Sequence, residues 1–261
     1  MTIWKQELRQ GLLSLLIWTG SIGFLVVICV LLFPEMQGQM NQVSDMFASM
    51  GSFTAAFGMD RLNFGTLIGF YAVECGNILG LGGAFYAALI AVSALAKEEK
   101  ERTAEFLLSH PVSRVSVISS KLAALVIQVV VMNAVIFALS AACIAAIGEE
   151  PAWKEICLLH LAYFLLQLEL AGICFGISAF LRRGSLGIGL GIAAMMYFLN
   201  IIANISEKAE FLKAVTPFGY AEGADIVANG SLDSELVLVG MIFALIGIAA
   251  AYFWYSRKDI H

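Results

Sequence analysis

The sequence predicts an all-α membrane protein with six transmembrane helices. Of its 261 residues, 60% are hydrophobic and only 13% are charged, a composition that excludes a soluble globular core. Six apolar runs approach or exceed the roughly 20 residues that a helix needs to cross about 30 Å of hydrocarbon. We place the six spans at residues 12–33, 66–96, 122–147, 156–181, 185–205 and 236–255.

The distribution of lysine and arginine predicts the orientation of these spans, because short loops rich in these residues stay in the cytoplasm. With both termini inside, 11 of the 15 basic residues fall on the inner side and 4 on the outer side. We therefore expect a multi-pass protein of a bacterial plasma membrane, with cytoplasmic N- and C-termini. The protein is then surrounded by the lipid bilayer, and we expect no nucleic acid as a partner.

Residues 1–11 have an amphipathic pattern, with Trp4 on the apolar side. This pattern predicts an interfacial elbow helix on the inner leaflet, where tryptophan is enriched. Its role is either simple anchoring or mechanical. In the first outer loop, apolar residues from Val43 to Phe57 recur at helical spacing. They predict a helix on the outer leaflet or a flexible, methionine-rich wall that touches a cargo.

Between the last two spans, residues 206–235 contain apolar clusters that are too short to cross a bilayer. They predict re-entrant or interfacial half-helices on the outer side. Asn229 and Gly230 then favour a turn, and Ser231, Asp233 and Glu235 supply capping oxygens and acids for the last helix.

Ionisable and polar groups inside apolar runs are costly and are therefore candidates for function. They are Glu74, Glu169, His160 and Gln167. Glu74 falls near the outer headgroups when the span is counted back from its inner end. Gln167 and His160 belong to a polar stripe that either lines a cavity or, for His160, lies at the interface.

Glu169 lies in the middle of its run and shares a helical face with Gly172 and Gly176, small residues that let another helix come close. The carboxyl group either packs against that helix or contacts a cargo or a proton. Gly187 and Gly191 form a second pair of this kind. The five cysteines lack paired spacing, which favours buried thiols over disulfides, and neither they nor the three histidines predict a metal site.

The charged block at residues 97–114 separates the second span from the third. It predicts a cytoplasmic helix with ion pairs around Arg102 and an apolar tip at Phe106–Leu108. Pro111 ends this helix, because the residue before a proline is disfavoured in the helical region, and Ser113 can cap the third span. A plain connector needs no apolar tip among charges, so the block favours docking to a cytosolic partner.

This block resembles the segment after the second span in permeases of type 2 ATP-binding-cassette (ABC) exporters. The positions that carry the resemblance, and to which it assigns contact with an ATPase, are Glu98, Arg102, Thr103, Glu105, Phe106, Leu107, Leu108, Pro111 and Arg114. Arg102 departs from the pattern, in which a glycine often precedes the threonine. The ending Ser256–Ile260 is also similar to that of these permeases, and six spans with an elbow helix agree over the whole chain.

The resemblance implies a single transmembrane permease domain over residues 1–261, with residues 97–114 as its coupling segment. It implies a dimer with a second copy or a related permease, and two separate cytosolic ATPases that bind ATP and magnesium. This chain binds no cofactor in that arrangement and is not an enzyme. In agreement, the sequence has no G-x-x-x-x-G-K-[ST] phosphate loop.

Two other classes of membrane protein fit part of the sequence. A secondary transporter could couple transport to protons through Glu169, but it predicts an internal repeat that the sequence does not show. A non-transporting membrane anchor or sensor also fits the composition. An intramembrane enzyme fits poorly, since no serine and histidine are placed as nucleophile and base.

Overall fold

The computed structural model describes residues 3–97, 112–181 and 186–258, with the backbone alone at residues 39–45, 47–49 and 52. All regular structure in these ranges is helical, and six helices are long and apolar enough to cross a membrane, as predicted. The long helices are α1 (Ile3–Ser49), α3 (Leu67–Ser93), α6 (Arg114–Ile147), α7 (Trp153–Phe180), α8 (Leu186–Ile205) and α10 (Ser234–Arg257). The short ones are α2 (Ser52–Ala55), η1 (Met59–Arg61), η2 (Glu207–Ala214) and α9 (Gly223–Asn229).

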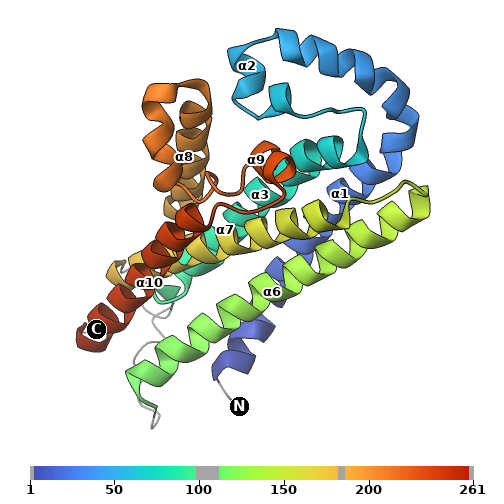
Figure 1. The fold of residues 1–261 in the computed structure, drawn as a ribbon. Helices are drawn as coiled ribbons and strands as arrows, with labels where there is room; N and C mark the ends of the chain where they lie inside the picture. Colours follow the sequence, from blue (N-terminus) through green and yellow to red (C-terminus); the bar gives the residue numbers. More distant parts are fainter. Residues whose placement is uncertain (1–2, 98–111, 182–185, 259–261) are drawn as a thin grey trace.

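Both termini lie at one end of the bundle, which we call the terminal end (Figure 1). The short helices α2, η1 and α9 lie toward the other end, which we call the distal end. The described part of the chain stops at Lys97 and resumes at residue 112, just before α6. Both of these points lie at the terminal end of the bundle. Residues 98–111 themselves lie outside the described residues.

Helix α1 is longer than the predicted first span. The elbow segment and the span, which we expected to be separate helices, form one helix that continues past Pro34 to Ser49. No proline stands between Ile3 and Phe33 to interrupt the backbone hydrogen bonds. Proline removes only one of these bonds, so α1 continues beyond Pro34. The last part of α1 turns over the distal end of the bundle (Figure 1).

Local signals at other helix ends act as the sequence predicts. The Ser113 hydroxyl accepts a hydrogen bond from the Ser116 amide and caps α6. The Asp233 carboxylate accepts from the amides of Glu235 and Leu236 and caps α10. Gly230 ends α9 with a φ of 57°, which a glycine adopts without strain. Helix α6 begins eight residues before the predicted span, because the apolar run marks hydrocarbon and not the end of the helix.

Helices α3 and α7 form the centre of the bundle, and 61% of the apolar window of each is buried. Helix α7 packs between α3 and α10, and α1 packs against α6. By contrast, only 22% of the window in α8 and 17% in α10 are buried, so most of their apolar surface is left for lipid or another subunit.

Glycines allow α7 and α10 to approach backbone to backbone. A Cβ atom added at Gly176 would lie 2.5 Å from the Gly247 carbonyl oxygen, and one at Gly172 would lie 2.9 Å from the Ala244 Cα. Gly191, in contrast, has open space beside it, and Gly187 is exposed. In α8 it is Gly189 that packs against α3, at the Ala88 carbonyl.

We expect Gly176→Ala to destabilise the protein by about 1–3 kcal/mol, because the added methyl group meets backbone that cannot move aside. Gly191→Ala is the matched control, since the same methyl group enters open space and alanine favours helix. Thermal unfolding of the purified variants in detergent measures both effects. Equal unfolding temperatures for the two variants would contradict this packing.

Candidate functional site

The coupling segment is anchored on both sides at the terminal end. Before it, the Lys97 ammonium donates a hydrogen bond to Gln10 of α1 at 2.6 Å. After it, the Arg114 guanidinium donates to the backbone carbonyls of Tyr255, Ser256 and Lys258 at the end of α10. Such carbonyls have no partner within their own helix. The segment is therefore bracketed by the first and the last helix of the chain.

Arg114 is the one member of the predicted ATPase-contacting set within the described residues, and its guanidinium is directed at this chain's own C-terminal helix. The other members of that set lie outside the described residues: Glu98, Arg102, Thr103, Glu105, Phe106, Leu107, Leu108 and Pro111.

A second anchor at the terminal end is an ion pair between α1 and α6. The Lys121 ammonium lies 2.9 Å from a Glu7 carboxylate oxygen, and the Lys121 side chain is only 1% exposed. The sequence analysis did not predict this pair. Next to it lies a cavity of about 450 Å³ between α1, α3 and α6, lined by Trp18, Lys97 and Gln128 among others.

The predicted polar candidates in the spans are mostly buried and hydrogen-bonded. Gln167 is fully buried, accepts a hydrogen bond from Asn133 of α6 at 2.6 Å and donates to a backbone carbonyl of α3 at 3.4 Å. His160 is also buried in the fold, with its Nε2 atom 2.6 Å from the Tyr71 hydroxyl. Glu74 is half-buried on α3, and its carboxylate makes no hydrogen bond with the described residues.

Glu169 is 1% exposed at the contact between α7 and α10. The Tyr220 hydroxyl donates a hydrogen bond to its carboxylate at 2.9 Å. The same carboxylate lies where a side chain at position 240 would be, so Gly240 of α10 provides its space. This carboxyl group thus connects α7, α10 and the segment between α8 and α9.

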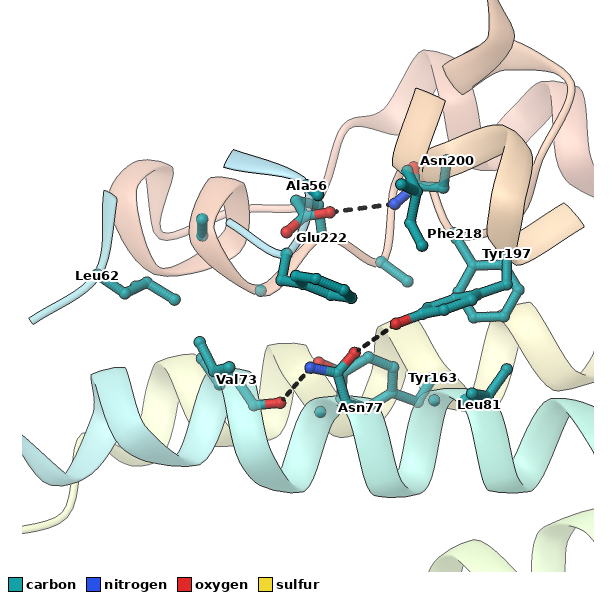
Figure 2. A pocket seen from close by; sticks show the side chains of 18 residues that line it. Ala56, Leu62, Val73, Asn77, Leu81, Tyr163, Tyr197, Asn200, Phe218 and Glu222 are labelled. Atoms are coloured by element: carbon teal, nitrogen blue, oxygen red, sulfur yellow. Dashed lines mark hydrogen bonds between the residues drawn. The ribbon is translucent and has the colours of Figure 1, made fainter. Parts of the chain in front are cut away.

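The distal end contains a cavity that the sequence analysis did not predict. It lies between α3, α7, α8 and the residues around α9, and its volume is about 40 Å³. Figure 2 shows Glu222 and Asn200 on one side and Asn77 on the other, with the Tyr197 hydroxyl directed at Asn77. The Tyr197 hydroxyl donates to the Asn77 side-chain oxygen at 3.2 Å.

Glu222 is the charged group of this cavity and is only 9% exposed. Its Oε2 atom accepts hydrogen bonds from the amides of Asn200 at 3.2 Å and Asn204 at 2.9 Å. Its other oxygen lies against Gly58, whose φ of 66° and missing side chain leave the room for it. Burial raises the pKa of the Glu222 carboxyl above its ordinary value, and the two amide hydrogen bonds oppose that effect.

No three His, Cys, Asp or Glu side chains come together as ligands in the described part of the chain. All five cysteines are free thiols, but they are not all buried as we expected, since Cys157 is exposed. It lies near the start of α7, on the same exposed face as Leu161.

Comparison with known proteins agrees with the architecture. A search of curated proteins finds no significant match to the chain. A family model described as ABC-2 family transporter protein matches residues 1–260. With six apolar helices and a match over nearly its whole length, this chain belongs to the ABC-2 family of membrane permeases.

Proposed function

We propose that this chain is one of two membrane subunits of an ATP-driven exporter, and that residues 97–114 couple it to separate cytosolic ATPases. Permeases of this family are transmembrane subunits that lack the nucleotide-binding domain. The observation that carries the proposal is the anchoring of the coupling segment. Its two flanks are hydrogen-bonded to α1 and to the end of α10, so a push on the segment acts on both helices.

The apolar tip supplies the binding energy that such coupling needs. Exposed ion pairs contribute only about 0–1 kcal/mol each, whereas moving a two-state protein from 1:99 to 99:1 takes about 5.5 kcal/mol. Burial of Phe106, Leu107 and Leu108 in a partner can provide an energy of this size, at about 1.5–3 kcal/mol for each large side chain. In this proposal both termini are cytoplasmic and the distal end faces outward.

The double variant Phe106→Asp/Leu107→Asp tests the docking role. We expect it to abolish co-purification of the ATPase from native membranes in mild detergent, because two charges replace the buried apolar contact. The chain contains a matched control, since residues 210–212 repeat the Glu-Phe-Leu triplet of residues 105–107 on η2 at the distal end. Phe211→Asp/Leu212→Asp makes the same change there and should leave the ATPase bound. Retention of the ATPase by both variants would exclude docking through this segment.

The variant Glu7→Gln tests the transmission of force from the segment to α1. It removes the charge that faces the buried Lys121 ammonium, and we expect a loss of about 1.5–3 kcal/mol in stability and weaker stimulation of ATP hydrolysis by cargo. Glu35→Gln is the control, because Glu35 is an exposed carboxylate on the same helix. The measurements are thermal unfolding and ATPase activity of the reconstituted complex. Equal unfolding temperatures and equal ATPase activities of the two variants would show that the ion pair contributes neither to stability nor to coupling.

A buried carboxyl group in the middle of a span also favours an alternative function, proton-coupled transport. The variant Glu169→Gln distinguishes that alternative from the ATP-driven exporter proposed here. Glutamine keeps the shape beside Gly240 and still accepts a hydrogen bond from Tyr220. An ATP-driven exporter should therefore keep a substantial part of its activity, whereas a transporter that carries protons on Glu169 should lose all of it. Transport into inverted vesicles, with ATP or with a proton gradient alone, distinguishes the two.

A further inference from the structure

The carboxyl group in the distal cavity forms no direct ion pair with a lysine or arginine within the described part of the chain, and Arg61 acts on it only at longer range. The two nearby cations are Arg61 and Lys213, and both bind Asp225 instead of Glu222. Glu222 accepts its hydrogen bonds from the neutral amides of Asn200 and Asn204. Burial disfavours the charged form of the Glu222 carboxyl group, and buried charges in proteins are normally paired or bound to a cation. A cation bound in this cavity would therefore stabilise the ionised carboxylate.

A second observation points to a ligand at the same place. Asn200 lines the cavity and is only 6% exposed, yet its side-chain oxygen has no hydrogen-bond partner among the described residues. The side-chain oxygen of Asn204, whose amide nitrogen donates to Glu222, has none either. Unpaired buried acceptors are uncommon in native proteins. The cavity thus places one unpaired acceptor, the Asn200 side-chain oxygen, beside the Glu222 carboxyl group, and a positively charged donor would satisfy both.

The walls of the cavity favour an organic cation over a metal ion. Four aromatic side chains line it: Phe57, Tyr163, Tyr197 and Phe218. The faces of aromatic rings attract ammonium groups, whereas Ca²⁺ requires six to eight oxygen ligands. The rings of Tyr197 and Phe218 pack edge to face with their centroids 5.2 Å apart, which gives one wall a fixed shape.

The size of the cavity sets which ammonium group it can hold. With about 40 Å³ open to water-sized groups, it has room for roughly three of them, at about 10–15 Å³ each. The NH₃⁺ end of a primary amine fits this space and offers three donors. A quaternary ammonium group with four methyl substituents is too large and has no donor.

We propose that this cavity binds the NH₃⁺ group of a primary amine between Glu222 and the aromatic walls, and that the exported cargo carries such a group. The assignment of the amine to the cargo rests on the proposed function, while the binding site itself does not. Its position at the distal end, away from the coupling segment, is where a cargo would be held before release to the outer side.

Binding can be measured on the full chain without any ATPase. The protein is reconstituted in nanodiscs of phosphatidylglycerol, which contains no amine, and its thermal unfolding is followed at constant ionic strength. We expect ethylammonium chloride to raise the unfolding temperature with saturation, and tetramethylammonium chloride and sodium chloride to have no such effect. A cavity that prefers tetramethylammonium or sodium, or that does not respond to ethylammonium, would overturn the proposal.

Two variants localise the site. We expect Glu222→Gln to bind ethylammonium at least tenfold more weakly, a change of about 1.4 kcal/mol, because it removes the negative charge and keeps the side-chain shape. Glu210→Gln on η2 is the matched control, since Glu210 is exposed and does not line the cavity. Unchanged affinity of Glu222→Gln would contradict the site. If Glu222→Gln fails to fold, the preference of the unaltered chain for ethylammonium over tetramethylammonium and sodium still tests the proposal.

The assay also separates this inference from the proposed function. Saturable binding by a chain that never co-purifies with an ATPase would keep the amine site and remove its role in export. An ATPase-coupled chain without amine binding would keep the proposed function and remove the site.

Discussion

The packing of α7 between α3 and α10 is the constraint on which the rest of the structure depends. In a bilayer the lipid tails are as apolar as leucine, so helices associate through close contacts and hydrogen bonds and not through the hydrophobic effect. Gly172 and Gly176 supply the close contact with α10, and Gln167 supplies hydrogen bonds to α3 and α6. Helix α7 thereby becomes the fixed centre around which the more exposed helices are arranged.

The two ends of this bundle have different chemistry. At the terminal end, ionic and backbone contacts connect α1, α6 and α10 around the coupling segment, through Glu7, Lys121 and Arg114. At the distal end, a buried carboxylate lies among neutral amides and aromatic rings. The Tyr220 hydroxyl donates a hydrogen bond to Glu169 of α7, and Tyr220 stands two residues before Glu222 in the chain. Helix α7 is therefore linked through Tyr220 to the distal cavity. This connection provides a physical route between the helices that coupling would move and the cavity.

The sequence predicted the number of spans and several local ends because these depend on short-range physics. Apolar length identifies a span, and Ser113 and Asp233 cap their helices through amides a few residues away. It did not predict the Glu7 to Lys121 pair or the Glu222 cavity. These join residues that are 114 and about 20 positions apart, and only the packing of the helices brings them together. In α8 the spacing of Gly187 and Gly191 predicted a packing face, whereas it is Gly189 that lies against α3, because spacing alone does not say which face meets a neighbour.

The central claim is that a separate ATPase drives this permease by holding the segment between α3 and α6. Electron cryo-microscopy of the complex purified from native membranes with its ATPase tests it most directly. The account predicts that residues 97–114 lie in a groove of the ATPase, with Phe106 and Leu107 buried there and both termini on the same side. A structure in which the ATPase binds elsewhere, or in which this segment lies on the opposite side of the membrane, would contradict it.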